Sequence, residues 1–359
     1  MATRTVIALE EMHKFVVRSM EAVGTKREHA TALADLLVAA DYRGHFSHGL
    51  NRLDMYVNDM KMGMCCCDKE PEVVKETAAT ALVEGHNLLG PVVGKFCTDL
   101  AIKKAKESGV GWVSARGSNH FGIAGWYAMR AMEHGMMGLA FTNTSPLMVP
   151  TRATQKSLGT NPIACAAPAN NGDSFVLDMA TTAVALGKLE LNERKGIDIP
   201  LGWGCDEKGK ATTKPSQANG LMPLGGTEEC SGYKGYGLAM MVEIFCGIMS
   251  GAEFGRNIRT WKTTDREANL GQCFIVVDTS AFAPGFSDRL SELSSSLRDL
   301  EPSEEQEKVL IPGDPEKVHM EKCDKLGGIE YHPNQIDFAN DLAKELNIQP
   351  VKVIGEEVK

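Results

Sequence analysis

The sequence predicts a mixed α/β (α+β) protein with two domains. The chain has 359 residues, which is enough for two domains of ordinary size. Its first sixty residues carry apolar side chains at helical spacing. From residue 79 onward, short apolar runs typical of buried strands alternate with helical patterns.

The N-terminal helical pattern has three segments. They cover residues 9–23, 27–42 and 50–63, and glycines stand where the first and third would end. The later pattern predicts strands at 79–84, 110–115, 136–142, 163–167, 175–178 and 272–278. It predicts helices at 91–108, 126–133, 179–182, 238–249, 287–300 and 336–346. The segments 143–150, 158–162, 202–209 and 311–316 are predicted as turns, 216–231 as a surface loop and 301–308 as a solvated acidic run.

Composition narrows the class of protein. Hydrophobic residues make up 43% and charged residues 24%, as in ordinary globular domains. The net charge is −9 and there is no basic run, which argues against nucleic acid as a partner. No apolar stretch is long enough to span a membrane, and residues 1–5 carry no apolar signal segment. We therefore expect a cytoplasmic protein with no membrane partner.

Ten cysteines are present, three of them consecutive at Cys65, Cys66 and Cys67. No pair has the two-residue spacing of a zinc or redox motif. We expect reduced thiols that pack as small core residues, and no metal. A metal site at the triple cysteine is the disfavoured alternative.

A glycine-rich turn at residues 117–125 joins a predicted strand to a predicted helix. Three glycines would let the backbone approach a flat or charged group, and Asn119 and His120 add polar side chains. Free amides at the following helix start would favour an anion such as a phosphate. The alternative is a plain strand-to-helix turn with one capped histidine.

A second polar turn covers residues 43–49. If a helix begins near Ser47, His48 and Arg52 are four residues apart and share a face. A histidine can exchange a proton near neutral pH, and an arginine can hold a carboxylate through two hydrogen bonds. Together they would suit an acid that carries a hydroxyl or keto group. Spacing alone favours the alternative, an N-cap serine with a surface histidine and arginine.

Two further polar residues have two interpretations each. Asp178 ends a predicted strand and could cap a helix, the commoner use, or bind a ribose hydroxyl. Lys234 could meet a phosphate or carboxylate, or be solvated. No glycine fingerprint of the βαβ dinucleotide-binding unit is present, so a nicotinamide dinucleotide would need another scaffold.

Taken in order, these motifs resemble the type-2 malate/L-lactate dehydrogenase family, whose members are also called malate/L-sulfolactate dehydrogenase-like. The resemblance spans nearly the whole chain and rests on the order and spacing of short motifs. These are Ser47-His48-Gly49 with Arg52, Ser118 to Gly122 with Ala124-Gly125, Thr144-Ser145-Pro146, Leu158 to Pro162, Asp178 to Thr181, Gly187-Lys188, Gly202-Trp203, Thr212-Thr213, Gly232 to Gly235 and Pro312-Gly313.

The resemblance implies a fold and an assembly. A largely antiparallel sheet domain of non-Rossmann type, residues 76–299, would bind NAD(P). A helical domain would combine residues 1–75 with residues 300–359. Family members are typically homodimers with the active site near the subunit boundary, so a homodimer is expected.

The resemblance also implies roles for single residues. His48 would be the proton donor, oriented by Ser47, although His120 remains an alternative donor. Arg52 would anchor the substrate carboxylate, and Thr160 and Gly187 would be further substrate contacts. The cofactor contacts would be His120, Phe121, Gly122, Ile123, Ala124, Asp178, Met179, Ala180, Lys234, Gly235, Pro312, Gly313 and Asp314.

The implied reaction interconverts a 2-hydroxy acid and a 2-oxo acid with NAD, NADP not being excluded. Malate is favoured through the family name, and Arg116, Arg152 and Lys188 are unranked candidates for its second carboxylate. Lactate, sulfolactate and cyclic imino acids are alternative substrates, and a catalytically silent cofactor-binding protein is the alternative of another class. Two departures from the family pattern, Thr151 to Ala153 and Thr227 to Cys230, fall in loops expected near the cofactor.

Overall fold

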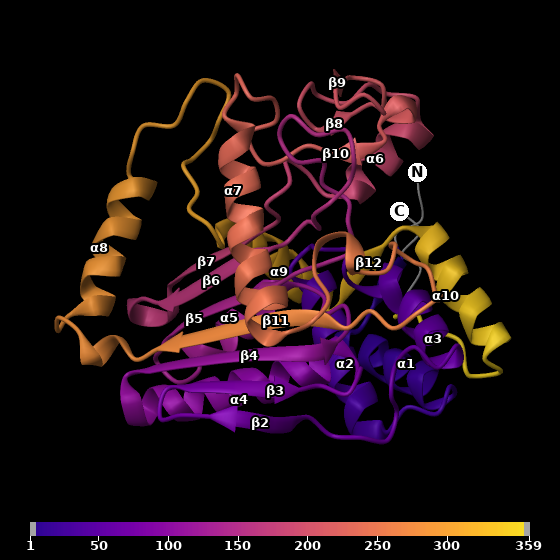
Figure 1. The fold of residues 1–359 in the computed structure, drawn as a ribbon, viewed down its shortest axis with the longest axis horizontal. Coiled ribbons are helices and arrows are strands. Elements are labelled where there is room, and N and C mark those ends of the chain that lie inside the picture. Colours follow the sequence, from indigo (N-terminus) through magenta and orange to yellow (C-terminus); the bar gives the residue numbers. More distant parts are fainter. Residues whose placement is uncertain (1–4, 355–359) are drawn as a thin grey trace.

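The computed structural model describes residues 5–354 and contains, within that range, ten α-helices and twelve β-strands (Figure 1). The strands form sheets of seven, three and two strands. The mixed α/β class predicted from the sequence is confirmed. The expectations for residues 1–4 and 355–359 lie outside the described residues.

The seven-stranded sheet is largely antiparallel. Its strand order is β2-β3-β4-β11-β5-β6-β7, and β3 with β4 is the single parallel pair among its described strands. The strands are β2 (Glu72–Glu76), β3 (Thr80–Glu84), β4 (Val110–Ser118), β5 (Met137–Thr142), β6 (Ile163–Pro168), β7 (Ser174–Met179) and β11 (Leu270–Val277).

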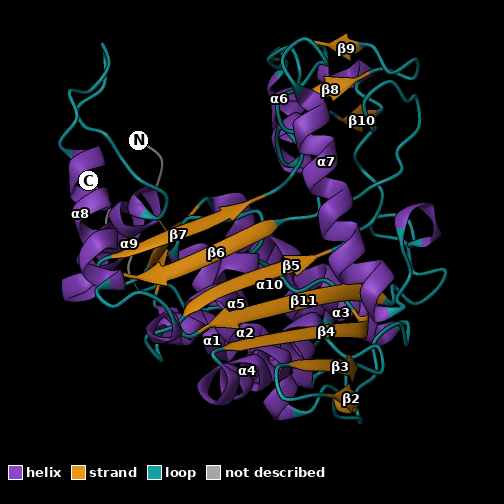
Figure 2. Cartoon of the chain, turned by 60° about the vertical axis from the view of Figure 1, so that its left-hand side comes forward, coloured by secondary structure: helices purple, strands orange, loops and turns teal. Residues whose placement is uncertain are grey.

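Helices lie on both faces of this sheet (Figure 2). The helices α4 (Gly90–Ser108) and α5 (Ala124–Met132) pack against one face. On the other face lies α7 (Gly232–Glu243), which continues into a π-helical turn, Ile244–Ile248. The helix α8 (Phe286–Arg298) stands at the edge, apart from α7 (Figure 1).

The two ends of the chain lie together. The helices α1 (Leu9–Glu21), α2 (Arg27–Tyr42) and α3 (Leu53–Lys61) precede the sheet, and α9 (Asp314–Leu326) and α10 (Pro333–Glu345) follow it. The strands β1 (Thr5–Ile7) and β12 (Ile329–Tyr331) pair antiparallel, and the Tyr331 hydroxyl donates to Asp41 at 2.7 Å. These contacts agree with the proposed helical domain of residues 1–75 and 300–359, whose boundaries remain a prediction.

One hydrophobic core joins this helical region to the sheet. The amphipathic helix α2 buries Leu33, Leu36 and Leu37, and these belong to the same cluster as Val113 of β4 and Tyr127 of α5. Because the cluster is continuous, the turn that follows α2 is held against the turn that precedes α5.

A small lobe carries the remaining elements. It contains α6 (Leu186–Lys195) and a three-stranded sheet of β8 (Gly204–Cys205), β9 (Ala211–Thr212) and β10 (Gly220–Leu221). Its own cluster comprises Val184, Leu189, Ile199 and Leu221. The lobe therefore has a separate apolar centre above the large sheet.

Three sequence predictions are wrong. No helix follows Asp178, because Thr181 turns its amide and hydroxyl to the Thr160 carbonyl, at 2.8 and 3.0 Å. The predicted turn at 311–316 begins α9, since proline in a first helical turn loses no hydrogen bond. The predicted surface loop 216–231 contains the buried strand β10.

The helix α7 also begins earlier than predicted, at Gly232 rather than Leu238. A Cβ at Gly232 would lie 2.0 Å from the Gly226 carbonyl oxygen, and one at Gly235 would lie 2.4 Å from the Leu224 amide nitrogen. The glycines that weakened the helical pattern therefore allow this turn of helix to pack directly on backbone.

Candidate active site

A cavity of about 560 Å³ lies between the helical region, the sheet and the small lobe. Thirteen of the predicted site residues line it, and they come from five separate segments of the chain. They are Ser47, His48, Arg52, His120, Phe121, Gly122, Ile123, Ala124, Thr160, Asp178, Met179, Ala180 and Gly187.

A buried carboxylate, that of Asp41, fixes the turn that carries His48 through hydrogen bonds. Asp41, at the end of α2, accepts hydrogen bonds from the Leu50 amide at 2.9 Å and from the Tyr331 hydroxyl. A Cβ at position 49 would lie 1.9 Å from Asp41 Oδ1, so glycine is required there. Burial raises the pKa of Asp41 to about 7.

His48 and Arg52 are both tied to Ser47. The Ser47 hydroxyl lies 2.9 Å from His48 Nδ1, and Arg52 Nε donates to the Ser47 carbonyl at 2.7 Å. The terminal nitrogens of Arg52 pair with no carboxylate in the part of the chain that is described, so they are available to an acid in the cavity. Both residues line the cavity, and the roles predicted for them remain predictions.

The two candidate proton carriers lie side by side. The His48 and His120 rings are nearly parallel, with centroids 5.9 Å apart. Burial, and secondarily the Arg52 charge, lower the pKa of His48 to about 4. Burial also holds the pKa of His120 well below its ordinary value, with His48 and Arg52 adding to the effect. Both rings are therefore neutral at pH 7, the form that accepts a proton.

Tyr56, which is fully buried in α3, fixes the tautomer of His120. Its hydroxyl lies 2.7 Å from His120 Nδ1, and the Gly122 amide donates to the same nitrogen at 3.4 Å. An amide can only donate, so Nδ1 is the unprotonated nitrogen and Tyr56 is the second donor. The proton of neutral His120 is therefore on Nε2.

The start of α5 carries the glycine-rich turn. Gly117 and Gly122 adopt positive φ, and a Cβ at Gly122 would lie 2.5 Å from the Leu36 side chain. Asp178 of β7 accepts the Gly125 amide at 2.7 Å, so its carboxylate holds the first turn of α5 against this neighbouring strand. Burial raises the pKa of Asp178 to about 6. The carboxylate also lines the cavity.

The opposite wall of the cavity comes from β7, its following loop and the small lobe. The Thr160 amide bonds the Thr144 hydroxyl at 2.9 Å, which fixes the loop that carries Thr160. Gly187, in the first turn of α6, has open space where a Cβ would lie. Next to it, Lys188 places its ammonium 5.8 Å from the Trp203 ring, and both residues line the cavity.

Five predicted cofactor contacts do not line the cavity. Lys234 is exposed, and Gly235 packs on Leu224. Pro312 accepts the Val176 amide at 3.0 Å, and Gly313 lies over the same valine. The roles predicted for them remain predictions.

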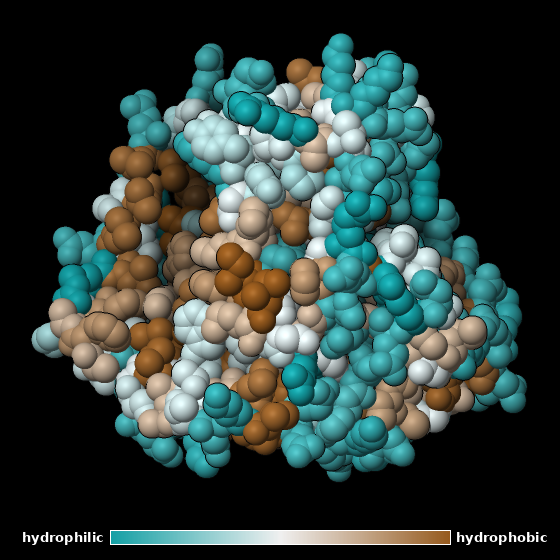
Figure 3. Space-filling view, viewed as in Figure 1, coloured by the Kyte–Doolittle hydropathy of each residue, from teal (hydrophilic) through white to brown (hydrophobic). Residues whose placement is uncertain are grey.

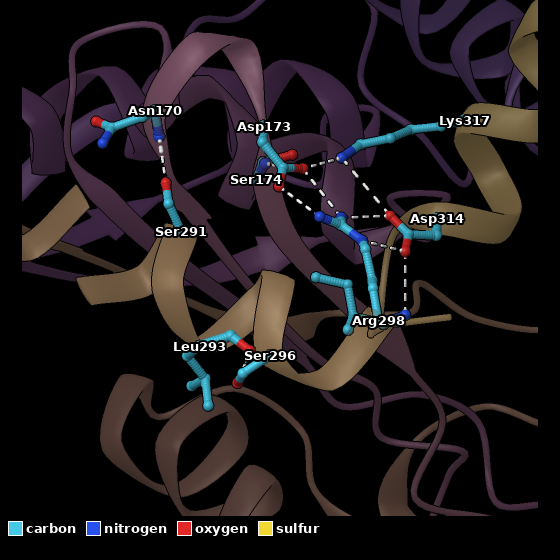
Figure 4. Close-up of polar contacts among 10 residues, drawn as sticks. Asn170, Asp173, Ser174, Ser291, Leu293, Ser296, Arg298, Asp314 and Lys317 are labelled. Carbon is cyan, nitrogen blue, oxygen red and sulfur yellow. Dashed lines mark hydrogen bonds and ion pairs between the residues drawn. The ribbon is translucent and has the colours of Figure 1, made fainter. Parts of the chain in front are cut away.

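The fifth of these residues, Asp314, is part of an ion-pair network at the start of α9 (Figure 4). Arg298, at the end of α8, lies between Asp173 and Asp314, at 2.7 Å from each. Lys317 adds a 2.6 Å contact to Asp173. This network joins α8 and α9 to the residue that precedes β7, and Asp314 accepts bonds within it.

Sequence reasoning missed three residues that contact the predicted site. Tyr56 lies within the helix predicted at residues 50–63 and contacts His120, and its i+4 spacing from Arg52 could have indicated a shared face. Trp261 and His45 also line the cavity. No local signal points to Trp261, which lies in a segment without regular pattern.

Within residues 5–354, no three His, Cys, Asp or Glu side chains gather in a way that could hold a metal ion. No helix in that range is long and apolar enough to cross a membrane. In the triple cysteine, Cys65 is buried and Cys67 is exposed, and both are free thiols.

A family model described as malate/L-lactate dehydrogenase matches residues 7–338. A malate dehydrogenase of Pyrococcus horikoshii is 40% identical over 95% of this chain and 95% of its own. A malate/(S)-sulfolactate dehydrogenase of Methanothermus fervidus is 38% identical over 96% of this chain and 99% of its own. The solved structure of a malate dehydrogenase from Pyrococcus horikoshii OT3 superimposes with a TM-score of 0.89 at 36% identity, covering 97% of each chain.

Proposed function

Because the chain belongs to the malate/L-lactate dehydrogenase family, we propose that its cavity is the active site of an NAD-dependent malate dehydrogenase. The chain is a 2-hydroxyacid dehydrogenase, an enzyme that interconverts a 2-hydroxy acid and a 2-oxo acid. The observation that carries the assignment of the site is the meeting of His48, His120 and Arg52 in one cavity.

Arg52 binds the carboxylate of the acid. Its Nε is held by the Ser47 carbonyl, so the guanidinium is fixed and its terminal nitrogens are free for a two-point contact. Carboxylate and C2 oxygen are adjacent in a 2-hydroxy acid. An acid bound to Arg52 therefore presents its C2 oxygen to the nearby imidazoles.

His48 moves the proton. The Ser47 hydroxyl on Nδ1 orients the ring, and the lowered pKa leaves His48 neutral and ready to accept the proton of the hydroxyl group. In reduction the same group donates the proton. A carboxylate on Arg52 cancels the charge that lowers the His48 pKa, so binding of the acid favours the protonated ring. His120 is the alternative donor, through its Nε2 proton.

Members of this family use a nicotinamide cofactor, and relatives of this chain are named for NAD(+) and for NADP(+). When bound, the nicotinamide exchanges a hydride with C2 of the acid. The residues present fit such a group. Phe121, Ile123 and Leu186 give apolar walls, and Gly187 leaves open space. Asp178 presents a carboxylate to the cavity.

The cofactor site is proposed to be of non-Rossmann type. The sheet whose strand β7 ends with Asp178 and Met179 is largely antiparallel, whereas the Rossmann unit is built on parallel strands. Asp178 also favours NAD. A buried carboxylate accepts a ribose hydroxyl and repels a ribose phosphate.

Malate is proposed as the substrate because one of the three candidate cations lines the cavity without an ion-pair partner among the described residues, which supports a second carboxylate there. Arg116 pairs with Glu84 at 2.7 Å and Arg152 with Glu228 at 2.6 Å, and neither lines the cavity. Lys188 lines the cavity and forms no ion pair with a described residue. Lactate lacks the second carboxylate and so has no group that would bind this cation. A sulfolactate would use it in the same way as malate.

A spectrophotometric screen tests the function. NADH and NADPH oxidation would be followed with oxaloacetate, pyruvate, sulfopyruvate and a cyclic imine. The expected result is the highest kcat/KM with oxaloacetate and NADH. A faster reaction with sulfopyruvate or a cyclic imine would overturn malate. Cofactor binding without turnover of any of the four acids would identify a catalytically silent protein. The lack of a carboxylate partner for Arg52 and the adjacent rings of His48 and His120 argue against that outcome.

We propose further that the enzyme is a homodimer joined through α7 and α8. Six apolar side chains of this surface are 40–55% exposed: Met240, Ile244 and Ile248 along α7 and its continuation, and Leu293, Leu297 and Leu300 along α8 and just beyond it. Figure 3 shows apolar side chains gathered around the hollow between these helices. Light scattering should give twice the chain mass, and Ile244→Glu should give the monomer.

A further inference from the structure

A buried carboxylate stands at the end of α7. It belongs to Glu243, the last residue of the helix, which is 6% exposed. Figure 2 shows α7 running from the small lobe down to the large sheet, so this end of the helix lies at the sheet. A buried carboxylate costs free energy unless polar groups satisfy it, so its contacts show what it holds in place.

Glu243 accepts three hydrogen bonds, each from a different segment of the chain. Its Oε1 accepts from the Asn143 side-chain amide at 3.0 Å and from the Gly255 backbone amide at 2.9 Å. Its Oε2 accepts from the Asn161 side-chain amide at 2.7 Å. All three partners donate, so this position requires a side chain that only accepts.

The two asparagine side chains are fully buried and are bonded through both of their polar atoms. The Asn143 nitrogen also donates to the Glu253 carbonyl at 2.8 Å, and its oxygen accepts from the Gly271 amide at 2.9 Å. The Asn161 nitrogen also donates to a backbone carbonyl of α7 at 3.1 Å, and its oxygen accepts from the Thr144 amide at 3.2 Å. A buried network satisfied in this way favours one arrangement of the segments that it joins.

Each of the three segments carries residues of the active-site cavity. Two of the segments place these residues directly beside an asparagine of the network, and the third places one six residues beyond Gly255. They are Thr144, Ser145, Thr160, Pro162 and Trp261. Glu243 does not line the cavity, so it acts on the site only through these segments.

The backbone departs from regular geometry on both sides of the carboxylate. The turn that follows Glu243, Ile244–Ile248, is π-helical, and a Cβ at Gly247 would lie 2.8 Å from the Asn143 side-chain nitrogen. Asn161 adopts a φ of +35°, which L residues rarely adopt. Such π-helical turns are rare and are frequent at functional sites, and strained backbone persists only where its surroundings hold it.

We propose that Glu243 is a positioning residue for the dehydrogenase reaction, which holds the loops of Thr144 and Thr160 in the shape that receives the acid. This inference rests on the proposed function. Without an acceptor at position 243, buried donors on these loops lose their partner and the loops move apart. The acid then binds more weakly, whereas the chemical step changes less, because His48 and Arg52 come from another segment.

Glu243→Gln is the most direct test, because a carboxamide has nearly the shape of a carboxylate. With its oxygen at the position of Oε1 it keeps two bonds, and its nitrogen meets the Asn161 nitrogen, donor against donor. The KM for oxaloacetate should rise about tenfold, the effect of one lost buried hydrogen bond, and kcat should change about twofold or less. A lower kcat with an unchanged KM would mean a loss of folded enzyme only and would overturn the inference.

Asn161→Ala tests the same contact from the loop side, including the case in which Glu243→Gln does not fold. It removes the facing donor and should also raise the KM for oxaloacetate about tenfold. In the double variant the two donors no longer oppose each other, so the KM should stay within about twofold of that of Asn161→Ala. Fully additive effects, about a hundredfold in the double variant, would contradict a shared contact.

Glu253 supplies the matched control. It joins the network through its backbone carbonyl, which a change of side chain keeps. Glu253→Gln therefore removes a carboxylate from the same region and should leave the KM for oxaloacetate at the wild-type value. An equal rise of KM in Glu253→Gln and Glu243→Gln would assign the effect to lost charge rather than to the held loops, against the inference.

Hydrogen–deuterium exchange reports on the loops without turnover. In Glu243→Gln, the Thr144 and Thr160 amides should exchange at least about tenfold faster, while the amides of β4 stay protected. Unchanged exchange at both threonines would overturn the inference. Failure of the proposed function would instead appear as wild-type enzyme that turns over none of the acids.

Discussion

The Tyr56 hydroxyl lies 2.7 Å from Nδ1 of His120, in a contact that joins α3 to the glycine-rich turn. Tyr56 is fully buried, so this hydroxyl has no water to replace its partner. We expect Tyr56→Phe to lower kcat about tenfold, the cost of one lost hydrogen bond expressed in the rate. Steady-state kinetics would measure it.

Tyr42→Phe is the control for this change, because the Tyr42 hydroxyl bonds Asp324 at 2.8 Å, away from the cavity. It should leave kcat at the wild-type value. Equal losses in both variants would mean that Tyr56 acts on stability rather than on His120.

The two histidines are separable by substitution. His48→Ala should lower kcat by roughly 10²–10⁴-fold, the usual contribution of a general acid or base, while NADH binding changes little. His120→Ala should cost less, because His120 orients and polarises rather than transfers the proton. NADH affinity measured by fluorescence titration completes the experiment. The reverse order of effects on kcat would make His120 the proton carrier.

Contacts of the site between residues close in sequence could be predicted, whereas contacts that depend on tertiary packing could not. The helix expected to begin near Ser47 is not seen, because His48 lies in a turn before the short helix Leu50–Arg52. His48 and Arg52 nevertheless lie together, as their spacing predicts, because both bond Ser47. The 5.9 Å approach of His48 to His120 depends on packing between α2, α4 and α5, which no spacing encodes. Trp261 lies near Arg52 in a segment that Arg259 ties to Asp59, two hundred residues away in sequence, and no spacing predicts this contact.

The fold shows the same division. The strands β4, β5 and β11 are short apolar runs, so the sequence pattern predicts them. Their antiparallel pairing was predicted only from the family resemblance. The helix α9 was missed because its first residues combine glycine, aspartate and proline, the composition of a turn. Its charged surface gives only a weak apolar stripe, since it buries few side chains.

The pH dependence of malate oxidation reports the histidine pKa. An ordinary histidine acting as a base would cause kcat/KM to fall below about pH 6.5. Burial and Arg52 lower the pKa of His48 to about 4, so the neutral base persists to lower pH. We expect kcat/KM to stay level from pH 8 to about pH 5 and to fall below it. An acid limb near pH 6.5 would contradict the assignment.

Lys188 should distinguish acids with one carboxylate from acids with two. Lys188→Met keeps the length of the chain and removes the charge. We expect the KM for oxaloacetate to rise at least about tenfold and the KM for pyruvate to change little. Arg152→Met removes an exposed cation outside the cavity and should change neither value. Parallel losses for the two acids in Lys188→Met would assign the lysine to the cofactor instead.

Asp41 links stability to pH through the turn that carries His48. Its pKa is about 7 in the folded chain because of burial, against 3.8 for the exposed group, so the folded state holds a proton that the unfolded state releases between these values. The protonated form therefore stabilises the fold below about pH 4, and this contribution is lost as pH rises through 7. The total is at most about 4 kcal/mol, at roughly 1.4 kcal/mol per pKa unit.

In Asp41→Asn, the amide oxygen can still accept the Leu50 and Tyr331 hydrogen bonds, and the side chain at position 41 no longer titrates. Urea unfolding at pH 5 and pH 8 should show that the free energy of unfolding of wild type, taken relative to Asp41→Asn, is lower at pH 8. A difference between the two proteins that does not change with pH would mean that Asp41 stays ionised in the folded chain.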